Sequence, residues 1–255
     1  MRRLVTDTLI IAERNLIRLP RAPDLLLAFT VQPIMFALLF VYVFGGAIQT
    51  PGYSSYVDFL IPGIIVQNIA FGGFVTALGL NEDVHKGLID RFRSLPMARP
   101  AVLAGRTLSD VATNTLSIVV LLVTGIIIGF SFDNDVAHVI AGFGLLLLFG
   151  YAFSWVFAWV GLLVSSPEAA NSAGFIAVFP LTFVSSAFVP VQSMPTVLQD
   201  FAKVNPFTIT VDAMRSLWLG KPAGNNIWLA VLWALAIIAV FAPLAVRRYR
   251  QAAGR

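Results

Sequence analysis

Six long runs of apolar residues constrain this chain more than any other feature of its sequence. A helix needs about 20 apolar residues to cross the hydrocarbon core of a bilayer, and each run approaches or exceeds that length. A soluble domain could not bury them all, because hydrophobic residues make up 58% of the chain. The sequence therefore predicts an all-α integral membrane protein with six transmembrane helices. The predicted spans are residues 25–47, 59–80, 101–130, 136–164, 169–189 and 227–246.

The positions of the basic residues predict how the chain is oriented. Fourteen of the 17 Lys and Arg residues fall at the N-terminus, in residues 81–106 or at the C-terminus. Six spans place these segments on one side of the membrane, and basic residues gather on the cytoplasmic side. Both termini are therefore expected in the cytoplasm, and the net charge of +4 indicates orientation rather than nucleic-acid binding. Arginine outnumbers lysine by 14 to 3, as in GC-rich bacterial genomes, so we expect the bacterial inner membrane.

Residues 1–21 carry an amphipathic helical pattern. Apolar residues such as Leu9, Ala12 and Leu16 recur at intervals of three and four, and charged residues lie mostly opposite them. Such a helix suits the membrane surface, with its basic face toward the lipid head groups. We expect a cytoplasmic interfacial helix that contacts membrane lipids; the alternative is a solvated leader. The segment lacks the features of a removable signal peptide.

The stretch NEDVHKGLIDRFRSLPMARP, residues 81–100, is a charged loop between two apolar runs. Val84, Leu88, Phe92 and Leu95 form an apolar stripe at helical spacing, and proline ends the pattern at residue 96. A short amphipathic helix of this kind can dock in the groove of a partner, which its charged face would steer into place. A solvated loop with some helix explains the pattern equally well.

Two segments resemble a known family. GLIDRFRSLPMARPAVLAGRTLSD, residues 87–110, resembles the cytoplasmic loop and third-span entry of type-2 ATP-binding-cassette (ABC) exporter permeases of the daunorubicin-resistance kind. NPFTITVDAMRSLWLG, residues 205–220, is similar to the segment that precedes their last span. The resemblance covers nearly the whole chain. It implies a single ABC type-2 transmembrane domain, residues 1–255, that forms half of an exporter.

The resemblance also implies partners. The loop of residues 81–100 would be a coupling segment seated on a separate ABC ATPase subunit, and a second permease copy would complete a homodimer. Six charged residues are the predicted ATPase contact face: Glu82, Asp83, Lys86, Asp90, Arg91 and Arg93. Glu168, in the turn at residues 165–168, is a candidate second contact, although an ordinary turn between helices explains that sequence equally well.

The sequence supplies neither an energy source nor a catalytic centre of its own. The phosphate-binding pattern G-x-x-x-x-G-K-[ST] is absent, because Gly220-Lys221 precedes a proline and lacks the upstream glycine. There is no cysteine, the two histidines lie far apart, and no paired acids or nucleophile–base set stands out. We therefore expect a transport permease and not an enzyme, with no bound cofactor or metal. ATP and Mg²⁺ would be used by the partner ATPase.

The predicted spans carry aromatic and mildly polar side chains but no ionisable group near their middle. Such an interior suits hydrophobic or amphiphilic drugs, lipids or lipid-linked products that leave the cytoplasm or the inner leaflet. An ATP-independent secondary transporter or channel is the alternative, weakened by the lack of a buried proton relay. Arg106 and Asp110, near the cytoplasmic end of a span, are expected to form a local salt bridge. The interior residues are Gln32, Gln67, Asn68, Phe71, Phe74, Asn114, Phe149, Phe153, Trp155, Phe157 and Trp159.

Residues 190–226 form an unusual loop between the last two spans. Apolar runs lie between its prolines, and long loops without structure are uncommon. We expect an extracellular re-entrant segment of two short helices, in which Asp212 and Arg215 can pair at a spacing of three. A gate for cargo exit is one interpretation, and an interfacial cap anchored by Trp218 is the other. The candidate gate residues are Asn205, Pro206, Asp212 and Arg215.

Overall fold

The computed structural model describes residues 2–18, 23–86, 99–222 and 224–252. Every regular element within these residues is helical, as the all-α prediction requires. The helices are α1 (Arg2–Arg18), α2 (Pro23–Leu39), α3 (Tyr56–His85), α5 (Arg99–Ile127), α6 (Val136–Leu163), α7 (Pro167–Phe183), α8 (Thr196–Val204), α9 (Pro206–Leu219) and α10 (Asn226–Ala252). A π-helical turn, η2 (Phe40–Phe44), continues α2, and a 3-10 turn, η3 (Val191–Ser193), precedes α8.

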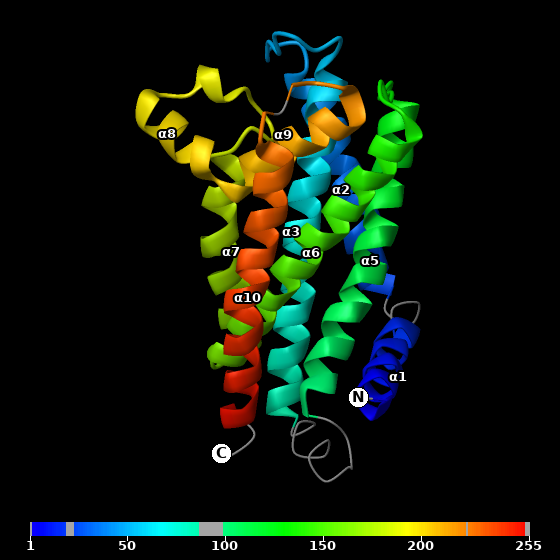
Figure 1. Cartoon of the computed structure of the whole chain (residues 1–255), viewed down its shortest axis with the longest axis vertical. Coiled ribbons are helices and arrows are strands. Elements are labelled where there is room, and N and C mark those ends of the chain that lie inside the picture. The colour runs from blue at the N-terminus through cyan, green and yellow to red at the C-terminus, as the bar shows by residue number, and fades with distance from the viewer. Residues whose placement is uncertain (1, 19–22, 87–98, 223, 253–255) are drawn as a thin grey trace.

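The long helices form one elongated bundle (Figure 1). Helices α2, α5 and α7 run away from the end of the bundle at which α1 begins and α10 ends, and α3, α6 and α10 run back toward it. We call this the termini end. Helix α1 packs beside α5 at the termini end, and α8 and α9 lie at the opposite end. Consecutive long helices are therefore antiparallel.

Four helices of the described residues are long and apolar enough to cross a membrane. They are Tyr56–His85, Ala101–Ile127, Val136–Leu163 and Asn226–Gln251. The first and fifth predicted spans correspond to the 17-residue helices α2 and α7. A 17-residue helix is about 26 Å long, against about 30 Å of bilayer hydrocarbon. Helix α2 gains length by continuing without a break into η2.

Helix α3 is the central helix of the bundle. It packs against α2, α5, α6, α7 and α9, and 72% of its most apolar stretch is buried, against 17% for α10. Glycines let the backbones of neighbouring segments approach it closely. A Cβ atom on Gly161 of α6 would lie 2.3 Å from the carbonyl oxygen of Ala77, and one on Gly63 would lie 2.2 Å from that of Ala187. Contact between backbones favours helix packing in membranes, where no hydrophobic force drives helices together.

Three helix ends lie five or six residues from the ends of the predicted spans. Helix α10 continues past residue 246 to Ala252. Helix α3 continues past residue 80 to His85, because apolarity ends at Leu80 but nothing there breaks a helix. Helix α7 ends at Phe183, earlier than predicted. The Asn205 side chain donates hydrogen bonds to the carbonyl oxygens of Leu181 and Val184, at 2.6 and 2.8 Å. These bonds satisfy carbonyl groups that the end of a helix leaves without partners.

Candidate functional site

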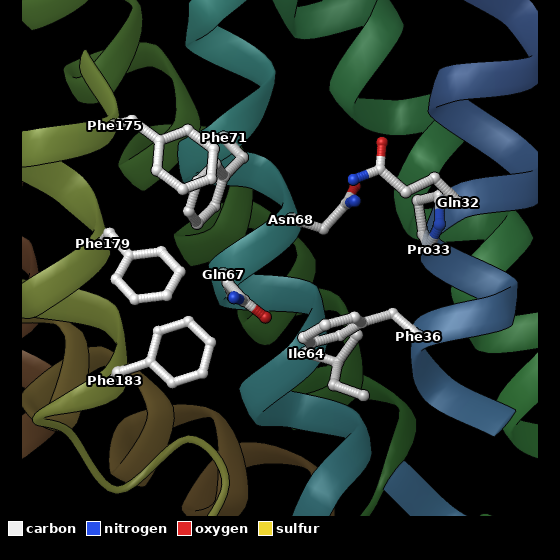
Figure 2. A pocket seen from close by; sticks show the side chains of 10 residues that line it. All are labelled: Gln32, Pro33, Phe36, Ile64, Gln67, Asn68, Phe71, Phe175, Phe179 and Phe183. Atoms are coloured by element: carbon white, nitrogen blue, oxygen red, sulfur yellow. The ribbon is translucent and has the colours of Figure 1, made fainter. Parts of the chain in front are cut away.

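A lateral groove runs along α3 between α2 and α7 (Figure 2). Its cavity volume is about 140 Å³. Figure 2 shows the three phenyl rings of α7 pointing toward α3, while Gln32 and Asn68 point toward each other across the gap between α2 and α3. The groove is thus mainly apolar, with a few amide groups. Its lining residues are Gln32, Pro33, Phe36, Ile64, Gln67, Asn68, Phe71, Phe175, Phe179 and Phe183.

The groove contains most of a continuous row of phenyl rings. Neighbouring rings in this row lie 4.2 to 5.6 Å apart between centroids. In order, the row consists of Phe74, Phe71, Phe175, Phe179, Phe183, Phe188, Phe40 and Phe36. Contacts at this distance stabilise aromatic pairs beyond the burial of their area. Phe175, Phe179 and Phe183 nevertheless remain 47, 41 and 37% exposed, so the α7 wall of the groove is incompletely covered.

The predicted interior residues divide between this groove and the bundle core. Gln32, Gln67, Asn68 and Phe71 line the groove, and Phe74 extends the row of rings. The remaining six lie elsewhere: Asn114, Phe149, Phe153, Trp155, Phe157 and Trp159. The sequence reasoning missed the rings of α7, although their spacing of four residues was a visible sign of one helix face.

Arg215 joins three segments at the end of the bundle opposite the termini. Its side chain on α9 is only 2% exposed. Nε and Nη2 donate to the carbonyl oxygen of Phe59 on α3 at 3.1 and 2.7 Å, and Nη2 also donates to that of Ser186 at 2.7 Å. Nη1 lies 3.1 Å from Oδ1 of Asp212, and the guanidinium carbon lies 3.6 Å from the centre of the Phe59 ring. A buried charge needs this degree of pairing.

The structure brings together two of the four predicted gate residues and places the other two at the start of α9. Asp212 and Arg215 form the predicted pair. Oδ1 of Asn205 accepts a hydrogen bond from the backbone N–H of Phe207 at 2.9 Å and so caps the start of α9, while its amide group holds the end of α7. Pro206 takes the first position of α9, where a missing N–H group costs nothing. The partners of Arg215 on other segments could not be found from spacing alone.

The termini end is held together by polar side chains that reach the end of α6. The Asn81 amide group on α3 donates to the carbonyl oxygens of Gly161 and Val164, at 3.1 and 2.9 Å. Arg248 Nε on α10 donates to that of Leu162 at 3.3 Å. These bonds satisfy the last carbonyl groups of α6. The end of α3 that carries the predicted coupling residues is therefore bonded to its neighbour.

Three of the six predicted coupling residues of the charged loop lie within the described residues. Lys86 Nζ lies 2.8 Å from Glu82 Oε2, and these side chains are 63 and 43% exposed. Asp83 is buried, with 7% of its surface exposed. Of these three residues, Glu82 and Lys86 are therefore the ones that a partner can reach. The other three, Asp90, Arg91 and Arg93, lie outside the described residues.

Glu168 lies in the first turn of α7, which Ser166 caps by accepting a hydrogen bond from the backbone N–H of Ala169 at 3.1 Å. His85, at the end of α3, lies close enough to Glu168 to influence it electrostatically. The two segments predicted to contact an ATPase therefore lie near each other at the termini end.

The prediction of a local salt bridge between Arg106 and Asp110 is wrong, because both side chains bond to α3 instead. Arg106 Nη2 donates to the carbonyl oxygen of Val75 on α3 at 2.7 Å, and the buried Asp110 accepts a hydrogen bond from the Thr76 hydroxyl group. A Cβ atom on Gly79 would lie 2.0 Å from Arg106 Nη2, so this glycine leaves room for the guanidinium group. Acceptors and donors on the neighbouring helix replace the local pair.

The arrangement defines a class of protein. Among the described residues, no group of three or more His, Cys, Asp or Glu side chains could hold a metal ion. What the helices do form is an apolar bundle with a lateral aromatic groove, a bonded cluster at one end and exposed charges at the other. These are the features of a helical integral membrane protein.

Comparison with known proteins identifies the family. The model of the ABC-2 type transporter family matches residues 6–219. The chain is 34% identical over 247 residues to the daunorubicin resistance ABC transporter permease protein DrrB1 of Streptomyces coeruleorubidus, covering 97% of this chain and 87% of that protein. It is 25% identical over 252 residues to the probable doxorubicin resistance ABC transporter permease protein DrrC of Mycobacterium tuberculosis, covering 98% and 91%. A probable multidrug ABC transporter permease of Escherichia coli, YbhR, is 26% identical over 189 residues, which are 72% of this chain and 50% of that protein.

This chain therefore belongs to the ABC-2 type transporter family. The resemblance seen in residues 87–110 and 205–220 is confirmed. The chain is a membrane permease rather than an enzyme, and in ABC systems ATP is hydrolysed by a separate subunit.

Proposed function

We propose that this chain is the membrane-spanning half of an ABC exporter that crosses the bacterial inner membrane six times. The alternating directions of α2, α3, α5, α6, α7 and α10 (Figure 1) support six spans. Within the described residues, the basic side chains of α1, of the start of α5 and of the end of α10 belong to segments that lie at the termini end. This end is therefore taken as cytoplasmic.

The lateral groove is the proposed cargo path. Phenyl rings and amide groups bind amphiphilic molecules through their apolar bodies and their few polar atoms. The relatives that match over nearly the whole chain are named for daunorubicin and doxorubicin resistance. The proposed cargo is accordingly a hydrophobic or amphiphilic drug, a lipid or a lipid-linked product.

A second copy of the chain is the proposed other half. The groove holds about 140 Å³, which is less than the roughly 300–1,000 Å³ of sites that enclose a drug-sized ligand. Its α7 wall also carries half-exposed phenylalanines. Two such grooves that face each other would form a complete path, and two permease halves would match the two sites of an ABC ATPase.

Helices α8 and α9 are proposed to form the re-entrant segment and outer gate. Val197, Phe201 and Val204 lie on one face of α8 and are 81, 43 and 63% exposed. An apolar face of this kind suits the outer leaflet. Helix α9 is mostly buried beneath it, and Arg215 links α9 to α3. A movement of α3 would therefore reach the outer gate directly.

One observation carries the proposal: the unbroken helix α3 bears both the accessible coupling residues and one wall of the groove. An ATPase bound to Glu82 and Lys86 at the cytoplasmic end would move the groove residues as part of the same rigid element. The contact of α1 with α5 and the exposed apolar residues Leu9, Ile10 and Ile17 suit the proposed interfacial helix.

Exchanging the charges of Glu82 and Lys86 tests the ATPase contact. The double variant Glu82→Lys/Lys86→Glu keeps the net charge and an i,i+4 pair. We therefore expect its free energy of unfolding to change by less than about 1 kcal/mol. It reverses the order of the two charges that a partner would contact. When the permease is coexpressed with the ABC ATPase of the same genome, copurification of the ATPase should therefore fall at least about tenfold. The readout is the ratio of ATPase to permease after affinity purification.

A matched control lies at the other end of the bundle. Asp200 and Lys203 form a similarly exposed pair, 2.9 Å apart, and the exchange Asp200→Lys/Lys203→Glu should leave copurification unchanged. Equal loss in both double variants, or no loss in either, would contradict the contact. Uphill transport by the purified permease without any ATPase would overturn the proposed function itself.

Phe179→Ala tests the cargo path. Phe179 lies at the centre of the row of rings, with neighbours at 5.3 and 4.2 Å. Removing one central aromatic contact should raise the cargo concentration for half-maximal ATPase stimulation about five- to tenfold. Ile176→Ala is the control on the same helix, since Ile176 is 76% exposed and does not line the groove. The same shift in both variants would exclude a role for the groove.

A further inference from the structure

A second cavity lies at the outer end of the bundle, beyond the groove. We call it the outer cavity. Its volume is about 590 Å³, within the range of small-molecule sites. Its wall differs in chemistry from that of the groove, because it contains two basic side chains and one acidic side chain. The lining residues that matter here are Tyr53, Gln192, Asp212, Arg215 and Lys221.

Lys221 is the cation available for a ligand. Its Nζ donates to the carbonyl oxygen of Gly52 at 2.6 Å, which uses one of three N–H groups. Within the described part of the chain, no carboxylate pairs with it. By contrast, Lys203 at the same end is paired with Asp200 at 2.9 Å.

Arg215 and Tyr53 complete the wall around this cation. The Lys221 ammonium group and the Arg215 guanidinium carbon lie 5.2 and 5.6 Å from the centre of the same Tyr53 ring. Asp212, the one acid, already accepts hydrogen bonds at Oδ1 from Ser186 and Arg215, at 2.8 and 3.1 Å. Burial raises the pKa of Tyr53, so its hydroxyl group keeps its proton and can donate. The wall therefore carries a net positive charge with donors to spare.

The outer cavity continues the groove along the same segments. Phe59 and Ser186 line the cavity, and Ile64 and Phe183 line the groove a few residues away on the same stretches of chain. The Tyr56 hydroxyl group donates to the carbonyl oxygen of Phe188 at 3.1 Å and ties the two stretches together. An amphiphile with its apolar body in the groove would thus place its head group near the outer cavity.

We infer that the outer cavity binds the phosphate or carboxylate group of an amphiphile, with Lys221 as the principal ligand and Arg215 as the fixed charge behind it. A neutral head group would leave the charge of Lys221 without a partner, and a cationic one would be repelled. The binding stands on the geometry of the cavity alone. That the bound amphiphile is exported cargo rests on the proposed function.

The absence of cysteine in this chain allows a local probe. Gln192→Cys places a single thiol on the cavity wall, and a fluorophore attached there reports binding to this cavity rather than to the basic cytoplasmic end. The labelled permease, without an ATPase, is titrated with dihexanoyl phosphatidylglycerol, dihexanoyl phosphatidylcholine and inorganic phosphate. We expect phosphatidylglycerol to saturate the signal at a concentration about tenfold lower than phosphatidylcholine.

Lys221→Gln should remove the preference for phosphatidylglycerol, and Lys221→Arg should retain it. Lys203→Gln, at the lysine that is paired with Asp200, should leave the preference unchanged. A signal from inorganic phosphate that depends on Lys221 would identify the free oxyanion as sufficient. A signal from phosphatidylglycerol alone would show that the apolar body is also required. Equal affinity for both lipids, or a preference that survives in Lys221→Gln, would overturn the inference. Neither result would affect ATPase copurification, so the two proposals fail separately.

Discussion

Arg215→Ala is expected to lower the free energy of unfolding of the permease by about 3–5 kcal/mol. The substitution leaves the carbonyl oxygens of Phe59 and Ser186 without their donor, and it leaves Asp212 without its counter-ion. It also removes a cation from the face of the Phe59 ring. The measurement is denaturant or thermal unfolding of the purified permease in a fixed detergent.

Two further variants keep this prediction testable even if the alanine variant is not recovered in folded form. Arg215→Lys retains the charge but lacks the planar fork that reaches three acceptors, so its stability should fall between those of the alanine variant and the native chain. Lys203→Ala breaks an exposed pair and should cost less than about 1 kcal/mol. An Arg215→Lys variant as stable as the native chain would show that charge alone suffices and that the bonds to three segments contribute nothing.

Gly161→Ala should lower the stability of the permease and Gly144→Ala should raise it, although each adds one methyl group to α6. At Gly161 the new Cβ would lie 2.3 Å from the carbonyl oxygen of Ala77 and 2.7 Å from its Cα. Backbone atoms cannot rotate away, so α3 and α6 must separate, at a cost of about 1–3 kcal/mol. At Gly144 nothing lies within 4 Å, and alanine is a better helix former by up to about 1 kcal/mol.

The same pair of variants separates stability from coupling. Gly161 also provides a carbonyl oxygen to Asn81, one residue before Glu82, which is a proposed coupling residue. Displacing α6 should therefore reduce cargo-stimulated ATP hydrolysis in Gly161→Ala even at temperatures at which the variant stays folded. Gly144→Ala should retain full stimulation. Destabilisation of both variants by similar amounts would mean that the close approach of α3 and α6 is not a constraint.

Much of the fold was visible in patterns of apolarity and charge. The apolar runs predicted helices whose cores the structure contains, because membrane helices must satisfy their backbone groups internally. The spacing of Asp212 and Arg215 predicted their pair, since three residues bring side chains to one face of a helix. Part of the groove was also anticipated, as the polar residues Gln32, Gln67 and Asn68 stand out in apolar surroundings.

Other features depended on contacts between distant segments. Periodicity extended the fifth span to residue 189, but α7 stops at Phe183, where Asn205, far along the chain, binds its last carbonyl groups. Arg106 and Asp110 have the spacing of a local salt bridge, yet each bonds to α3. In an apolar interior every polar group needs a partner, and the nearest one is often on another helix.

The amino-acid sequence by itself determined the helical class and the apolar segments, because bilayer thickness and helix geometry act on each segment alone. It also determined the family, because the resemblance lies in the residues themselves. Only the tertiary structure decided which side chains share a site. Arg215 reaches a carbonyl oxygen 156 residues away, and three separate helices supply the phenyl rings of one groove. Such contacts depend on how closely helices approach, which glycine and the shapes of neighbouring side chains set jointly, and no local pattern records that distance.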